Sequence, residues 1–225
     1  KVAGSGEAGN GADGIAIDNA INRPRGLAYN DATGNLYISD YYSNKIRVVD
    51  SGGFSNTGMG GSTSHVDGDV AYNHRCRQPQ GLHIYNDNLY VACRTENRVK
   101  RWDLTSDLVY TVYGDGGANI DGDGTDPTLA GGRYPYGVFV NAEGIYVSHM
   151  ENHLVRFINT MGVPKNFWGG ATVVAANTVR TIIGTGSASN DNNLVPTSNR
   201  VHTPTGVVAI GDQIFLTSRG GDDRL

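Results

Sequence analysis

The chain has 225 residues and a formal net charge of −4, and its 32 glycines are an unusually high number. Charged residues make up only 18% of the sequence, against about 25% in an ordinary soluble domain. No Lys/Arg cluster is available to neutralise a run of phosphates, and no window of about 18 residues is apolar throughout. The sequence therefore predicts neither nucleic-acid binding nor a membrane span, and its length and composition suit one large all-β domain.

A pattern of short predicted strands recurs along the chain. A first strand with the pattern Pro-x-Gly-(Leu/Val) is expected at 23–29, 78–84, 134–140 and 203–209. A second strand of the type Leu-Tyr-Ile follows at 34–40, 88–93, 144–149 and 213–218. A third strand of the type Asn-x-(Ile/Val)-Arg follows at 44–50, 97–103 and 153–159. Each copy is preceded by a short strand and a Gly-rich turn, at 2–6, 54–61, 111–116 and 181–186.

Each unit therefore holds four runs with strand composition, separated by Gly, Asn and Asp turns. A meander of this size cannot bury both faces alone, but copies stacked radially can. The interval between the third and fourth repeated prolines is the longest, which predicts an insertion near 161–177 between the third and fourth strands of that blade. Charged and apolar residues alternate on the third strand. This alternation predicts that the strand lies near the outer rim of the radially stacked units, with the charged residues Lys45, Arg47, Lys100 and Arg101.

The quoted motifs, in register over nearly the whole chain, resemble the NHL repeat family. The resemblance implies an all-β fold, a β-propeller of NHL type with recognisable four-stranded blades at about 1–50, 51–107, 108–178 and 179–225. The last blade ends within its third strand at Leu225. We therefore expect residues 1–225 to be a single but incomplete domain of a larger ring of about six blades. The alternative is a small ring that closes with four.

The family includes a peptidyl-hydroxyglycine amidating lyase, whose zinc-binding histidines directly follow the blade prolines and point into the central channel. The corresponding residues here are Arg25, Gln80, Tyr136 and Thr205. Zinc needs three or four converging N, S or O ligands, and this set cannot supply them. The resemblance thus implies the fold but not the lyase site. A lyase or hydrolase whose site is completed by residues outside this chain stays open as an alternative function.

One loop has the spacing of a calcium site. Asn119, Asp121 and Asp123 place oxygen atoms at alternate positions before a glycine, as in Ca²⁺-binding loops. The closing bidentate Glu is absent, because the twelfth position is Ala130. Equivalent Asp-Gly turns recur in other repeats, so a polar turn between blades is the competing interpretation, and calcium is the only cofactor that the sequence suggests.

The two cysteines are predicted to form a disulfide. Cys93 ends the second strand of its blade, and Cys76 lies just upstream of the first strand, so an antiparallel hairpin brings them together. Two free cysteines are the alternative. A disulfide would place the protein in an oxidising compartment, and the scarcity of lysine also favours a secreted, periplasmic or cell-surface protein.

These observations predict a non-catalytic binding scaffold that uses one face to hold a protein or glycan ligand. Loops carry function on such scaffolds, and arginine and aromatic side chains are frequent interface anchors. Besides the four channel residues, the predicted binding residues lie on turns expected to share that face: Tyr41, Tyr42, Arg94, His149, Met150 and Arg219. The alternatives are a structural component of an extracellular filament or surface assembly, and the enzyme described above.

Overall fold

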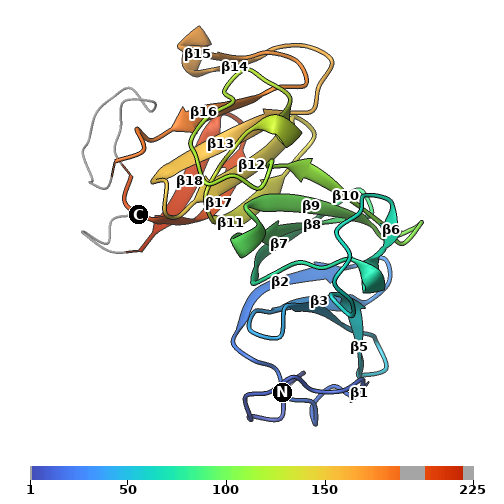
Figure 1. Cartoon of the computed structure of the whole chain (residues 1–225). Helices are drawn as coiled ribbons and strands as arrows, with labels where there is room; N and C mark the ends of the chain where they lie inside the picture. The colour runs from blue at the N-terminus through green and yellow to red at the C-terminus, as the bar shows by residue number, and fades with distance from the viewer. Residues whose placement is uncertain (1, 188–200, 220–225) are drawn as a thin grey trace. The chain divides into compact units, whose positions relative to one another are not determined.

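The computed structural model describes residues 2–187 and 201–219, which form antiparallel β-sheets joined by turns (Figure 1). The predicted all-β class is confirmed. The chain divides into two compact units, one of residues 1–93 and 100–110 and one of residues 94–99 and 111–225. The described residues also contain short 3-10 helices: η1 (Ala71–Asn73), η2 (Arg94–Glu96), η3 (Pro127–Leu129) and η4 (Trp168–Gly170).

The first sheet is a meander in which each strand pairs with the next one along the chain. Its strands are β2 (Pro24–Asn30), β3 (Asn35–Asp40), β4 (Lys45–Val49) and β5 (Phe54–Met59). The short β1 (Gly14–Ile15) pairs with β5 at the outer edge. The strand β1 belongs to the loop before β2. This loop, with its Asp-Gly turn, therefore reaches the edge of the sheet that lies farthest from β2.

The second sheet repeats this order. Its strands are β7 (Pro79–Tyr85), β8 (Asn88–Cys93), β9 (Arg98–Asp103) and β10 (Leu108–Tyr113), and β6 (Asp69–Val70) is added beside β10. The division into two units runs through β9 and β10. In both sheets the short strand that begins the next sequence repeat is the last strand of the preceding sheet, so the sheets are shifted by one strand from the sequence repeats.

The third sheet contains β11 (Pro135–Val140), β12 (Gly144–His149), β13 (Leu154–Asn159) and β16 (Val179–Ile183). Here the edge strand is covered by the loop before β11, through hydrogen bonds of Gly124 N and Thr125 O with Val179. The same arrangement thus appears in all three sheets.

The predicted insertion is confirmed as an extra hairpin. Its strands β14 (Lys165–Phe167) and β15 (Thr172–Val174) lie between β13 and β16 in the sequence and form a two-stranded sheet of their own. Phe167 is buried and packs edge-on against Phe157 of β13, with ring centroids 5.0 Å apart. The hairpin is therefore anchored in the apolar core of its unit.

The last described strands, β17 (Pro204–Ile210) and β18 (Gln213–Ser218), pair as a hairpin. Residues 224–225, where the sequence repeat was predicted to be cut, lie outside the described residues. The truncation, the number of blades and the closure of a ring stay predictions.

Neighbouring sheets within a unit pack through their first strands, β2 against β7 in the first unit and β11 against β17 in the second. The glycine of the Pro-x-Gly motif permits this approach, as expected. A Cβ atom added to Gly137 would lie 2.6 Å from the carbonyl oxygen of Thr205, which is too close for any real side chain. Apolar side chains such as Leu82 and Leu89 in the first unit and Phe157 in the second fill the space between the sheets.

One sequence prediction about local structure is wrong. Residues 2–6 form no strand; Gly4 N instead bonds to the carbonyl oxygen of Ala16, in the loop after β1. The rim position of the third strand stays a prediction, but Arg47 and Lys100 on this strand are each only 1% exposed. Alternation on these strands reflects burial on both faces, with the cations satisfied by loop atoms rather than by water.

Candidate functional site

The residue before each repeated proline has a backbone conformation that is rare for a side-chain-bearing residue. Its φ is positive in all four copies: Arg23 (55°), Gln78 (51°), Tyr134 (52°) and Thr203 (41°). Proline normally pushes the preceding residue into extended conformations, and positive φ is uncommon outside glycine. Such a conformation persists only where surrounding contacts hold it.

A side chain from the preceding sheet supplies one of these contacts in three copies. In each case the turn between second and third strands offers an acceptor to the backbone N–H of the residue before the next proline. The contacts are Gln78 N to Asn44 Oδ1 at 2.8 Å, Tyr134 N to Asn97 Oδ1 at 3.0 Å and Thr203 N to His153 Nδ1 at 3.1 Å. The asparagine of the Asn-x-(Ile/Val)-Arg motif therefore fixes the turn of the following sheet.

We use the name proline turn for one set of residues in each sheet. The set contains the two residues before the repeated proline, the residue after it and the turn that follows the second strand. In the first sheet the side chain of Asp40 supports this turn. The carboxylate accepts a hydrogen bond from Asn22 N at 2.8 Å and another from Arg47 Nε at 3.2 Å, with both side chains almost fully buried. Arg47 also donates to Asn10, Gly11 and Thr57, so it ties the preceding loop to the sheet.

In the second sheet a disulfide takes the place of this carboxylate. Cys93 faces Pro79 across β7 and β8, just as Asp40 faces Pro24 across β2 and β3. It is bonded to Cys76, with the two Cα atoms 5.1 Å apart, and neither residue is left free. The predicted disulfide is confirmed.

In the third sheet the equivalent residue is His149, which faces Pro135. It is fully buried, and its Nδ1 lies 3.2 Å from the carbonyl oxygen of Arg133, the residue two before the proline. Burial, reinforced by the Arg156 charge, lowers the pKa of His149 to about 3, so the ring is neutral and Nδ1 donates to the carbonyl. His149 was predicted to lie on the binding face; it belongs instead to the support of the turn.

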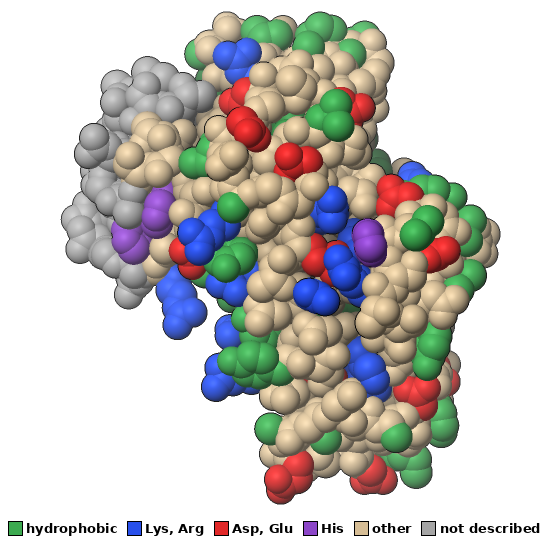
Figure 2. Space-filling model, viewed as in Figure 1, with side chains coloured by type: hydrophobic (Ala, Val, Ile, Leu, Met, Phe, Trp, Pro, Cys, Tyr) green, Lys and Arg blue, Asp and Glu red, His purple; other side chains and the backbone are tan. Residues whose placement is uncertain are grey.

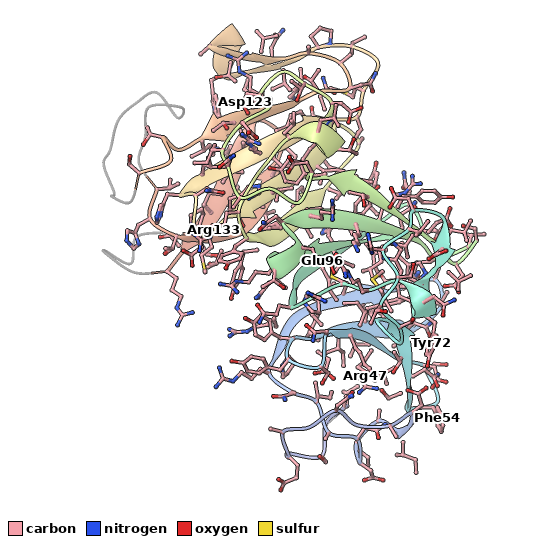
Figure 3. All side chains as sticks on the ribbon, in the orientation of Figure 1. Arg47, Phe54, Tyr72, Glu96, Asp123 and Arg133 are labelled. Carbon is pink, nitrogen blue, oxygen red and sulfur yellow. A yellow bond between two sulfur atoms is a disulfide. The ribbon has the colours of Figure 1, made fainter. Side chains whose placement is uncertain are left out.

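The cation of the third strand is also buried in the third sheet. Arg156 donates to the hydroxyl of Tyr113 at 3.2 Å and to the carbonyl oxygen of Gly131 at 2.6 Å. Its Nη2 lies 3.4 Å from Asp123 Oδ1 (Figure 3). Desolvation raises the pKa of Tyr113 to about 12, so the phenol stays protonated. This network joins the loop before β11 to the sheet that it precedes.

The predicted calcium loop is part of this network. Asp121 Oδ1 accepts a hydrogen bond from Gly131 N at 2.9 Å, and Asp123 Oδ1 accepts from both the amide and the hydroxyl of Thr181. Asp13 makes the same pair of bonds to Thr57 in the first sheet. Across residues 2–187 and 201–219 no three His, Cys, Asp or Glu side chains form a group that could hold a metal ion. These hydrogen bonds fit the polar-turn interpretation, and the calcium interpretation of Asn119, Asp121 and Asp123 stays a prediction.

On the proline turn of the first sheet, arginines lie over tyrosine rings. The guanidinium carbon of Arg23 is 4.9 Å from the ring centroid of Tyr42, and its Nη1 donates to the Tyr42 hydroxyl at 3.3 Å. The guanidinium carbon of Arg25 is 5.2 Å from the ring centroid of Tyr41. The two rings contact each other at 4.8 Å. In Figure 2, one flank of this unit shows blue Lys and Arg side chains beside green ones, and red acidic side chains lie at its base.

The second unit repeats this chemistry. Two guanidinium groups approach the ring of Tyr134: the guanidinium carbon of Arg94 is 3.9 Å from the ring centroid and that of Arg133 is 4.7 Å from it. Arg94 also approaches Glu151 at 3.9 Å. Arg133 is exposed, and Figure 3 labels it in this unit. The sequence analysis missed Arg23, Arg133 and Tyr134 as site residues, although their position directly before the repeated proline was a usable signal.

The other predicted binding residues differ in their exposure. Gln80 is only 2% exposed, because the neighbouring sheet packs over it, and it presents no surface for a ligand. Tyr136, Met150 and Thr205 are half-buried, and Arg219 is exposed. The structure thus brings Arg25, Tyr41 and Tyr42 together in one unit and Arg94 beside Tyr134 in the other.

The first sheet also exposes an apolar face. Leu27 is 63% exposed, whereas its equivalents within each unit that pack against a preceding sheet, Leu82 and Val207, are 8% and 5% exposed. A groove of about 350 Å³ lies here, lined by Val2, Ala3, Ile21, Pro24, Arg25, Leu27, Leu36 and Ile38. The groove occupies the place that a neighbouring sheet fills elsewhere in the chain.

Among the described residues no helix is long and apolar enough to cross a membrane. No protein-family model matches the sequence. A stretch of 125 residues, or 53% of the chain, is 30% identical to NHL repeat-containing protein 2 of Bos taurus. A longer alignment, over 96% of the chain, is 25% identical to the Arabidopsis thaliana protein SUPPRESSOR OF QUENCHING 1, chloroplastic. The chain spans only 17% and 21% of the length of these two relatives.

Solved structures share the fold. An auxiliary nutrient binding protein from Bacteroides thetaiotaomicron has a TM-score of 0.61 over 87% of this chain and 45% of its own, at 14% identity. A streptogramin B lyase has a TM-score of 0.52 over 87% of this chain and 48% of its own, at 11% identity. The repeats in register, the antiparallel sheets that each begin at the repeated proline and the similarity to NHL repeat-containing protein 2 support an NHL-repeat family for this chain.

Proposed function

We propose that this protein is a non-catalytic scaffold that binds a ligand through its proline turns. The observation that carries the proposal is the pairing of arginines, three of them exposed, with tyrosines on these turns in both units. Arginine and tyrosine are over-represented among residues that dominate binding energy. Buried contacts from neighbouring sheets hold the turns, so the side chains are presented with little conformational entropy left to lose on binding.

The proposal places the protein outside the cytosol, as a secreted, periplasmic or cell-surface protein. The Cys76–Cys93 disulfide supports this location, because such bonds persist in oxidising compartments. The likeness of fold to Bacteroides auxiliary nutrient binding proteins is compatible with ligand binding at such a location.

The test is a binding screen with matched variants. Defined oligosaccharides and peptides are immobilised, and the wild-type chain is compared with Tyr42→Ala, Arg133→Gln and the control Arg180→Gln, whose exposed side chain lies on the edge strand β16. We expect at least one ligand to lose affinity with the two proline-turn variants and not with the control. Mass spectrometry should recover that ligand unchanged. A ligand recovered cleaved would favour the enzyme, and no dependence on either variant would contradict the scaffold.

The exposed face of the first sheet favours a second candidate, in which the protein is a component of an assembly. A contiguous apolar surface rimmed by polar residues is typical of a protein interface. In this candidate, copies of the chain associate through the face that carries Leu27, and light scattering should give a mass above that of a single chain. Leu27→Asp should then restore the single-chain mass, whereas a wild-type chain that is already monomeric would contradict this candidate.

A further inference from the structure

Two sets of arginines among the described residues differ in their partners. The buried side chains of Arg47 and Arg156 each lie beside carboxylates of the chain itself, those of Asp13 and Asp40 and that of Asp123. Across the described residues, the exposed Arg23, Arg25 and Arg133 form no ion pair within the chain and lie over tyrosine rings instead. The carboxylates of Asp13, Asp40 and Asp123 thus pair with buried arginines. Among the described residues no carboxylate lies within ion-pair distance of Arg23, Arg25 or Arg133, whereas Glu151 pairs with Arg94 and interacts with Arg133 only at longer range.

We propose that these arginine–tyrosine pairs bind the Asp and Glu side chains of an acidic peptide segment, which rests on the proposed function and names its ligand class. A guanidinium group over a ring keeps its in-plane N–H donors available, and those donors match a carboxylate bidentately. The tyrosine beneath restricts the rotamers of the arginine and so lowers the entropy lost on binding.

The geometry of the first unit suits more than one carboxylate. Arg23 and Arg25 flank the same proline, and the rings beneath them are in contact at 4.8 Å. The two guanidinium groups therefore lie over adjoining surfaces. In an extended peptide, side chains two residues apart project to the same side at a spacing of about 7 Å. Two acidic residues at this spacing can therefore each contact one of the two guanidinium groups.

The recurrence of the arrangement supports the same ligand chemistry in each unit. In the second unit Arg133 and Arg94 flank the single ring of Tyr134. A neutral sugar stacks on an aromatic face, and in both units a guanidinium group already lies over each of these rings. Charged ligands are therefore favoured over neutral glycans.

The experiment measures fluorescence anisotropy of a labelled peptide of alternating Glu and Ala, with a Gln-and-Ala peptide as its neutral match. We expect the intact chain to bind the acidic peptide and not the neutral one. Each of R23Q, R25Q and R133Q should weaken binding about fivefold, as expected for loss of one exposed ion pair. The double variant R23Q/R25Q should weaken it more than either single variant. Raising the salt from about 0.05 M to about 0.5 M should weaken binding further, because exposed charge pairs are screened.

Controls separate this inference from the proposed function. R180Q should bind as the wild type does, and the thermal midpoint of every variant shows whether it folds. Equal binding of both peptides, or binding unchanged in R23Q/R25Q, overturns the inference. If a uronate oligosaccharide or oligouridylate binds in place of the peptide and depends on the same arginines, the acidic-peptide assignment is overturned while the proline turns remain a binding surface. If no ligand of any class depends on them, the proposed function fails as well.

Discussion

The proline turns of the first and second sheets have the same backbone shape but are supported by different chemistry. In the first sheet, Asp40 at the end of β3 accepts from the loop before the proline and from the buried Arg47. In the second, Cys93 at the end of β8 is bonded covalently to Cys76 in the corresponding loop. The residue opposite the repeated proline thus links the second strand to the loop before that proline. Either a buried ion pair or a disulfide bond can make this link.

The difference predicts how each turn fails. A buried ion pair gains little net stability, but loss of one partner leaves an uncompensated buried charge. A disulfide acts mainly by restricting the unfolded chain. Removing an electrostatic tether should therefore cost more than removing the covalent one.

Arg47→Met tests the electrostatic tether and should have the largest effect. It leaves the buried Asp40 without its cation and also removes the donors to Asn10, Gly11 and Thr57. We expect a loss of about 3–5 kcal/mol in the free energy of unfolding, measured by urea denaturation. The exposed Arg180→Met is the control. A loss below about 1 kcal/mol would show that water or another group can replace the guanidinium.

Reduction of the disulfide should have the next largest effect. The sequence separation of 17 residues between Cys76 and Cys93 corresponds to a stabilisation of about 3 kcal/mol in the chain-entropy model. The C76S/C93S variant should lose a similar free energy of unfolding in urea, and a reductant should destabilise the wild type but not this variant. If reduction costs more than Arg47→Met does, the proposed ranking of the two tethers is wrong.

The third sheet adds a pH-dependent tether to the comparison. The pKa of His149 is about 3 in the folded protein and about 6.5 when unfolded, so the unfolded state binds the additional proton between these values. Stability is therefore fully present above pH 6.5 and falls on acidification, by about 2 kcal/mol between pH 6.5 and pH 5. His149→Gln should flatten this part of the stability profile. If the free energy of unfolding depends on pH equally in the wild type and in His149→Gln, His149 takes up its proton in the folded protein.

Sequence reasoning was most accurate where a repeat or a strand register determined the outcome. The hairpin of the second sheet placed Cys76 near Cys93 without further information, and the long interval between prolines located the extra hairpin of the third sheet. The sequence pattern did not predict the burial of Arg47 and His149. A polar residue in a strand gives the same sequence pattern whether its hydrogen-bond partners are water molecules or atoms of a distant loop. Asn10 and Gly11 lie more than thirty residues from Arg47, and nothing in the local sequence links them.

The smallest expected effect comes from the contact that links one sheet to the next proline turn. Asn44 has a φ of 57° and accepts the N–H of Gln78. Asn44→Gly keeps the positive φ accessible and removes only the acceptor, so we expect a loss of about 1 kcal/mol in the free energy of unfolding. Asn44→Ala should cost more, since it adds the strain of the left-handed conformation. If Asn44→Gly costs nothing while Asn44→Ala still does, the asparagine serves its own turn rather than the following sheet. A larger loss for alanine, together with a measurable loss for glycine, would show that each sheet helps to shape the binding turn of the next.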